Sequence, residues 1–412
     1  MLKKISVDHL RTGMYIKEFC GSWMEHPFWR SQFVLDDPND IQRIRSSSIR
    51  EVWIDTAKGR DVERPEQGVS ESRSEAEVDA TLGEAARAQR QTSPSTTREE
   101  LTRAAAIYAK GRQAVSDMFG EARMGKAVDT VVARKVVEEI SDSVTRNAGA
   151  LISLARLKTA DEYTYMHSVA VCALMIALAR QLELDEEAVH AAGMAGLMHD
   201  LGKALMPMEV LNKPGRLTEE EFAIIKRHPE EGHRMLLQAG SAVDATTLDV
   251  CLHHHEKTDG SGYPHGLKDA QISLHAKMGA VCDVYDAITS NRPYKAGWDP
   301  AESIRKMAEW TEGHFDQRIF HAFVKSLGIY PVGSLVRLES GKLGVVVEQS
   351  RASLLKPIVK VFYSTKSKAR IAPKLVDLSH TTCQDAVADR EDPAQWNFPD
   401  LNELWSDGHA AY

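Results

Sequence analysis

The sequence lacks long apolar runs and contains few cysteines, and both absences restrict where the protein works. No stretch of about 18 consecutive apolar residues occurs, so a membrane-spanning helix is not predicted. The first residues, MLKKISVDHLRTGMYI, contain no continuous apolar segment of the kind found in secretion signals. The five cysteines are scattered, odd in number and without a C-x-x-C pair: Cys20, Cys172, Cys251, Cys282 and Cys383. This pattern indicates a reducing compartment without a disulfide framework, and we expect a cytoplasmic protein.

An excess of positive charge is also absent. The formal net charge of the 412 residues is −8, which argues against a surface that binds DNA, RNA or an anionic membrane. An anionic substrate would therefore need a local cluster of positive charge, supplied by metal ions or by a few basic side chains. The common nucleotide and esterase motifs are missing as well, since the sequence has no G-x-x-x-x-G-K-[ST], no G-x-S-x-G and no G-x-G-x-x-G after a strand.

What is present indicates a mainly helical protein of two or three domains. Alternating segments predict a small α/β domain over residues 1–60, and a polar stretch rich in Glu, Ser, Gln, Arg and Thr predicts a flexible linker over 61–97. Helical periodicity predicts a helical domain over 98–330. Short strands joined by Gly-containing turns then predict a small β subdomain over 331–380, followed by a C-terminal tail over 381–412.

Histidines are concentrated in the helical region. Ten of the sixteen lie between His167 and His275. His199 and Asp200 end an apolar helix, AAGMAGLMHD, so that both side chains can approach one point from the helix end. An imidazole and a carboxylate together suit a divalent transition metal. One such dipeptide is more often a solvated helix end, but five separated segments carry His or Asp at helix ends or on apolar helices, which favours a metal site.

The order of these segments carries a resemblance to a known family. The motifs are HSVAV, HDLGK, HPEEG, HHEKTDGSGYP and DVYDAITSNRPYK. In this order they resemble the HD-GYP family of cyclic di-GMP phosphodiesterases, over roughly residues 150–330. Residues 1–60 also resemble the small domain that often precedes HD-GYP domains. The resemblance implies an all-helical, HD-type, metal-dependent phosphohydrolase bundle between the small α/β domain and the β appendage.

The resemblance implies two metal sites that share one carboxylate. The first would be held by His167, His199, Asp200 and Asp283. Asp200 would bridge to the second, held also by His228, His254 and His255. Such ligands suit Fe or Mn first, then Ni or Zn, and do not resemble an oxygen-only Mg or Ca site. Two ions held in this way lower the pKa of a water between them, so that hydroxide exists at neutral pH.

Three other histidines and two residues of the DGSGYP loop are given no ligand role. His253 precedes the matching HHE register and is interpreted as a bystander, and His233 and His265 as exposed polar residues. Asp259 and Gly260 are interpreted as turn-forming residues.

We predict two ions and not three. Some family members bind a third ion through a glutamate four residues before the first histidine, where it shares a helix face with that histidine. That position is Tyr163 here, a poor ligand at neutral pH, and Glu162 lies about 100° away around the helix.

The same motifs imply four substrate contacts. Lys203, in HDLGK, matches the family lysine expected at the scissile phosphate, and together with Asp200 it is a candidate catalytic residue. Tyr263, in GYP, is expected in the substrate cleft. Arg292 and Lys295 match the family's phosphate and guanine contacts. Solvated surface charge is the alternative for Lys203, Arg292 and Lys295.

The functional prediction is an enzyme that converts cyclic di-GMP to pGpG, and on to GMP if the reaction continues. Two alternatives stay open: hydrolysis of another cyclic dinucleotide, or a non-catalytic or slow module that senses cyclic di-GMP and acts through protein partners. The helical stretch 98–145 allows a homodimer contact, although helices packed on the core are our prediction.

Overall fold

The computed structural model describes residues 1–21, 28, 32–64, 67–86, 95–126, 128–157, 163–213, 215, 217–291, 297–350 and 353–406. The chain divides into two compact units: Met1–Gly83 with Arg305–His314, and Glu84–Ile304 with Phe315–Tyr412. The elements follow the predicted order, with strands near both ends of the sequence and helices between them. The mainly α fold class is therefore confirmed.

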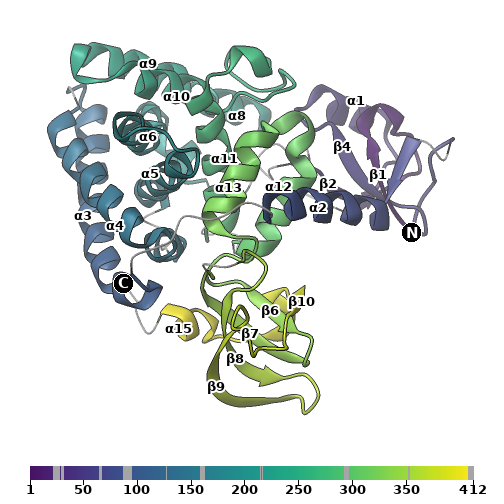
Figure 1. Cartoon of the computed structure of the whole chain (residues 1–412). Coiled ribbons are helices and arrows are strands. Elements are labelled where there is room, and N and C mark those ends of the chain that lie inside the picture. The colour runs from purple at the N-terminus through teal and green to yellow at the C-terminus, as the bar shows by residue number, and fades with distance from the viewer. Residues whose placement is uncertain are drawn as a thin grey trace. The chain divides into compact units, whose positions relative to one another are not determined.

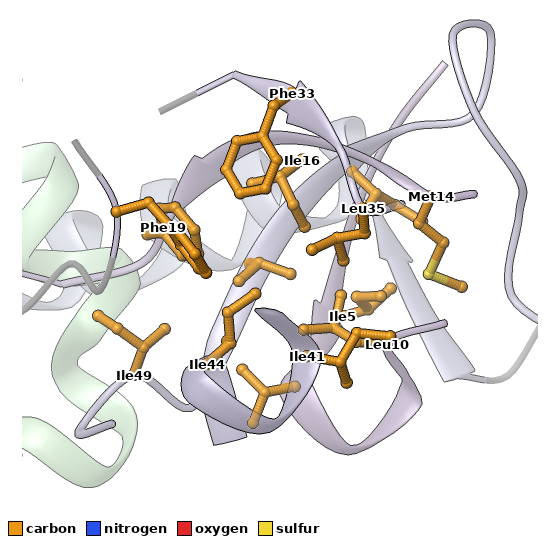
Figure 2. Close-up of a cluster of buried hydrophobic side chains, with 14 residues drawn as sticks. Ile5, Leu10, Met14, Ile16, Phe19, Phe33, Leu35, Ile41, Ile44 and Ile49 are labelled. Carbon is orange, nitrogen blue, oxygen red and sulfur yellow. The ribbon is translucent and has the colours of Figure 1, made fainter. Parts of the chain in front are cut away.

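The first unit contains a five-stranded antiparallel sheet of order β3-β2-β4-β1-β5. Its strands are β1 (Leu2–Ser6), β2 (Tyr15–Phe19), β3 (Phe33–Val34), β4 (Glu51–Asp55) and β5 (Gly68–Ser70), with a 3-10 turn, η1 (Val7–His9), after β1. Helix α1 (Pro38–Ser46) begins after Asp37, whose side chain accepts the Asn39 N–H. Figure 2 shows Ile41 and Ile44 of this helix gathered with Ile5 and Ile16 of the strands in one buried cluster.

The linker prediction for 61–97 is wrong over much of its length. The structure places β5 and helix α2 (Glu71–Ala86) there. Val78 and Leu82, four residues apart on one face, are buried, and so is Ala85. The segment was predicted to be a linker because its overall composition is polar. A narrow apolar stripe on one face of a helix changes that composition very little. Residues 65–66 and 87–94 of the predicted linker lie outside the described part of the chain.

The second unit contains most of the helices (Figure 1). In chain order they are α3 (Thr97–Arg123), α4 (Thr130–Ala155), α5 (Tyr163–Gln181), α6 (Glu186–Met198), the 3-10 turn η5 (Leu201–Leu205), α7 (Met208–Leu211), α8 (Glu219–Ile225), α9 (His228–Gln238), η6 (Gly240–Ala242), α10 (Ala245–His253), η7 (Asp269–Gln271), α11 (Leu274–Thr289), the start of α12 (Pro300–His314) and α13 (Gln317–Leu327). Helices α3 and α4 pack against α5, which confirms their predicted place on the helical core.

Helix α5 is the buried centre of this unit. Its residues from Val169 to Ala179 are buried all round, as a helix enclosed by α3, α4, α6, α11 and α13 requires. Helix α6 approaches its backbone closely, because a Cβ on Gly196 would lie 2.9 Å from the Cα of Cys172. That glycine precedes His199 by three residues, so the close approach helps to set where His199 lies relative to α5.

The C-terminal part of the second unit forms a small antiparallel sheet of order β10-β6-β7-β8-β9. The strands are β6 (Leu335–Leu338), β7 (Lys342–Glu348), β8 (Ile358–Ser364), β9 (Ala369–Asp377) and β10 (Val387–Arg390). The β subdomain is therefore present, but residues 381–412 are more than a tail. They supply β10, which pairs with β6, and the helices α14 (Pro393–Trp396) and α15 (Leu401–Ser406). Burial of Leu401 and Trp405 explains why this segment folds.

Candidate metal centre

Seven predicted ligands from five segments of the second unit lie close together. His167 lies in the first turns of α5, while His199 is the C-cap of α6 and Asp200 begins η5. His228 is the first residue of α9, three residues after the end of α8. His254 and His255 follow α10, and Asp283 lies within α11. The seven side chains are His167, His199, Asp200, His228, His254, His255 and Asp283, and six of the seven residues are buried, His255 being partly exposed.

One group of ligand atoms surrounds the Oδ2 atom of Asp200. The Nε2 atoms of His167 and His199 lie 3.2 Å apart, at 3.5 Å and 3.4 Å from Asp200 Oδ2. Asp283 Oδ1 is 2.9 Å from the His167 Nε2. His167, His199 and Asp200 can together hold a metal ion, and Asp283 lies within reach of the same point.

A second group surrounds the other oxygen of Asp200. The His228 Nε2 lies 3.2 Å from Asp200 Oδ1, and the His254 Nε2 lies 3.8 Å from the same oxygen. These two imidazole nitrogens are 3.3 Å apart. His255 completes a four-residue group that can hold an ion. Its Nδ1 is 3.7 Å from Asp283 Oδ2, so Asp283 also extends between the two groups.

Three of the imidazoles, those of His199, His254 and His255, have the charge state that metal binding requires. Burial, and then the neighbouring His199 and His228 rings, lowers the pKa of His254 to about 3. Burial also lowers the pKa of His199 and holds the pKa of His255 well below its usual value. Their imidazoles are therefore neutral and present lone pairs.

Asp200 is the strongest structural sign of a cation. Burial would raise its pKa, but Lys203 and the surrounding histidines keep the pKa well below its ordinary range, so the carboxylate is ionised. Its buried Oδ1 atom accepts no hydrogen bond from the described residues. A buried anionic oxygen without a donor is costly, and a divalent ion would satisfy it. The residues present therefore fit a metal centre.

Three ring nitrogens that face away from the cluster contact backbone carbonyl oxygens. The Nδ1 atoms of His199, His228 and His254 lie 2.7 to 3.0 Å from the carbonyl oxygens of Gly196, Ile225 and Val250. A ring that donates to a carbonyl through Nδ1 leaves its Nε2 lone pair free for an ion.

Asp286 is a functional residue that the sequence analysis missed. It is buried, and its Oδ2 lies 2.6 Å from the His167 Nδ1. Burial acts to lower the pKa of His167, but Asp283 and Asp286 hold the pKa above its usual value. The available signal was spacing, because Asp286 follows Asp283 by three residues and shares its helix face.

Lys203 and Tyr263, two of the predicted substrate contacts, each touch a residue of this cluster. The Lys203 ammonium donates to Asp200 Oδ2, and its side chain remains 21% exposed. The Tyr263 ring stacks on His255 with 4.6 Å between ring centroids and an interplanar angle of 25°. Arg292 and Lys295 lie outside the described residues.

The loop that carries Tyr263 is held by a second residue that the analysis missed, Glu256. This buried carboxylate accepts the N–H groups of His265 and Leu267 at 2.7 and 2.9 Å. Asp259 accepts the Ser261 N–H, and Gly260 has a φ of +81°, which confirms both as turn-forming residues.

The remaining histidines bind elsewhere. His253 contacts Asp249 through Nδ1 and His265 through Nε2, at 2.8 and 3.2 Å, which agrees with its interpretation as a bystander. His265 is exposed as predicted, whereas His233 is half-buried. For the third-ion question, Glu162 and the side chain of Tyr163 lie outside the described residues.

Within the part of the chain that the structure describes, no helix combines the length and the apolar character needed to cross a membrane.

The chain is similar to one curated protein over nearly its whole length. Residues 2–133 match a family described as a domain of unknown function, and residues 141–319 match the HD domain family. Over 98% of its length the chain is 54% identical to a cyclic di-GMP phosphodiesterase of Pseudomonas aeruginosa, 96% of which is covered.

More distant relatives match the helical region. A response regulator of Xanthomonas campestris, a cyclic di-GMP phosphodiesterase, is 37% identical over 42% of this chain and 47% of its own length. A 3'3'-cGAMP-specific phosphodiesterase of Vibrio cholerae is 33% identical over 53% of this chain and 47% of its own length.

Proposed function

Because the chain belongs to the HD-GYP family of cyclic di-GMP phosphodiesterases, we propose that it hydrolyses cyclic di-GMP to the linear dinucleotide pGpG at a two-metal centre. The position of Asp200 supports the presence of two ions. Its two oxygens face separate groups of imidazole nitrogens, as a bridging carboxylate would.

Each ion would have its own set of ligands from this chain. His167, His199, Asp200 and Asp283 would hold the first ion, and Asp200, His228, His254 and His255 the second. The mixture of imidazole and carboxylate ligands favours Fe or Mn, with Ni or Zn as further candidates. When bound, such a pair of ions supplies an activated water and neutralises charge on the phosphoryl oxygens.

The surrounding residues bind and orient the substrate. Lys203 is partly exposed beside Asp200, so its ammonium can meet an oxygen of the scissile phosphate and stabilise the charge that develops there. Tyr263 would form a wall of the substrate site next to His255. Arg292 and Lys295 would bind phosphate and guanine. For Arg292→Ala we expect a raised KM with unchanged metal content.

Two alternative functions are distinguished by the same assay. The similarity to a 3'3'-cGAMP-specific phosphodiesterase favours another cyclic dinucleotide as an alternative substrate. A sensing module that acts through protein partners is the other alternative, although the complete set of predicted ligands favours an enzyme.

The test is hydrolysis by the metal-loaded protein, with products separated by chromatography. Protein reconstituted with Fe(II) or Mn(II) should convert cyclic di-GMP to pGpG faster than it cleaves 3'3'-cGAMP. Asp200→Ala should abolish turnover, while Asp389→Ala, an exposed aspartate of β10 paired with Arg337, should retain it. Binding of cyclic di-GMP without turnover would support the sensing module instead.

A further inference from the structure

Lys226 is a cation that contacts aromatic rings and, within the described part of the chain, no carboxylate. It is the C-cap of α8, and its Nζ lies 4.7 Å from the centroid of the Phe222 ring and 5.4 Å from that of Tyr263. The two rings meet edge to face, with 6.5 Å between centroids. Among the described residues, no hydrogen bond or ion pair is formed by its ammonium.

Two acidic residues that lie five positions before and after Lys226 in the sequence pair with other cations. Glu221 pairs with Lys213 at 2.5 Å, and Glu231 pairs with Arg227 and Arg234. Among the described residues the ammonium contacts aromatic rings, and a cation–π contact alone is a weak interaction. An anionic group of a ligand could therefore bind Lys226 without first breaking an ion pair.

The position of Lys226 relates it to the metal centre. It precedes His228 by two residues, and the Tyr263 ring that it contacts stacks on His255. The Tyr263 ring therefore contacts both the Lys226 ammonium and His255, a member of the second group of ligands. Lys203, by contrast, contacts Asp200 directly.

We propose that Lys226 binds the second phosphodiester of the cyclic dinucleotide, the one that is not cleaved, while Phe222 and Tyr263 orient its side chain. The proposal rests on the proposed function. A cyclic dinucleotide carries two phosphodiesters in one small macrocycle. The metal centre and Lys203 neutralise the scissile group, so the other group needs a cation a short distance away. A phosphate oxygen would receive a charge-assisted hydrogen bond from the Lys226 ammonium.

The experiment compares three variants of the full-length, metal-loaded enzyme. Lys226→Met keeps the length of the side chain but removes its charge, and Lys226→Arg keeps the charge. Arg227→Met is the matched control, since this adjacent cation is 63% exposed and pairs with Glu231. For Lys226→Met we expect KM for cyclic di-GMP to rise about tenfold, the effect of one lost hydrogen bond to a charged group, with kcat changed less than twofold. Lys226→Arg should stay near the wild-type KM, and metal content should be the same in all variants.

Binding is measured separately, so that the two proposals can fail independently. Calorimetry with the slowly hydrolysed phosphorothioate analogue of cyclic di-GMP should give a dissociation constant about tenfold weaker for Lys226→Met. If wild-type protein binds the analogue but does not hydrolyse cyclic di-GMP, the proposed function fails while the Lys226 proposal is still tested. A wild-type KM and dissociation constant in Lys226→Met would overturn the Lys226 proposal. A loss of kcat or of metal in that variant would overturn it too, because either result would assign Lys226 to the metal centre or to folding.

Discussion

Among single residues, the hydrogen-bond partner of each imidazole on the side away from the cluster matters for the metal centre. Three of the ring nitrogens that face away from the cluster contact backbone carbonyls, but the Nδ1 of His167 contacts the Asp286 carboxylate at 2.6 Å. A carboxylate acceptor fixes the ring orientation and makes the coordinating nitrogen more basic. Asp286 should therefore contribute to metal affinity without touching the ion.

Asp286→Ala tests this role. Removal of the carboxylate should weaken metal binding about 10- to 100-fold, which is the usual effect of losing such a partner. Titration of the metal-free protein with Mn(II), followed by calorimetry, measures this change. Asp286→Asn should recover part of the affinity, because its amide oxygen can still accept the ring N–H. Equal affinities for the wild type and Asp286→Ala would contradict the assigned role.

Much of the ligand set could be predicted at this scale, and the outer contacts could not. The HD, HHE and GYP motifs identify their side chains by order in the sequence. The partners of His199, His228 and His254 are backbone carbonyls, and a carbonyl has no sequence signature. Asp286 and Glu256 do have one, since both lie inside the motifs, but only the fold shows which donor each carboxylate faces.

At the scale of elements, one close backbone approach sets the position of two ligands. A Cβ on Gly202, in η5, would lie 1.9 Å from the carbonyl oxygen of His228 and 2.6 Å from the Gly232 nitrogen. Only a glycine lets η5 lie this close to α9. Asp200 precedes this glycine by two residues and His228 begins α9, so the contact fixes the spacing of both ligands.

Gly202→Ala is the element-scale prediction. Because the added methyl group would overlap backbone atoms, η5 and α9 must separate, and we expect metal content and turnover to fall together. Gly120→Ala is the matched control. Gly120 lies within α3 with open space around its Cβ direction, so alanine there should be neutral or stabilise by up to about 1 kcal/mol. Full metal content in Gly202→Ala, measured by elemental analysis, would show that the contact does not position the ligands.

Element boundaries were predictable where a local signal existed. Thr218 with Glu221 three residues later is the sequence pattern of a capping box, and in the structure the two residues form that box at the start of α8. Helix α2 was missed because the burial of Val78 and Leu82 arises only in the folded chain. Tertiary burial of this kind outweighs a polar composition.

In the whole molecule, one compact unit contains segments that are far apart in the sequence. Domain boundaries predicted along the sequence do not show this. Residues Arg305–His314, predicted within the helical domain, belong to the first compact unit. Lys306 lies 3.0 Å from Glu18 there, an ion pair across 288 positions of the sequence. Sequence periodicity located the helix but could not assign its second half to a unit, because that depends on long-range contacts.

Metal stoichiometry measures whether the chain binds two ions bridged by Asp200, as we propose. Elemental analysis of the full-length protein saturated with Mn(II) or Fe(II) should give two equivalents per chain. Asp200→Ala should lose both, since each predicted ion shares that carboxylate. One equivalent or three in the wild type, or two equivalents retained by Asp200→Ala, would contradict the account.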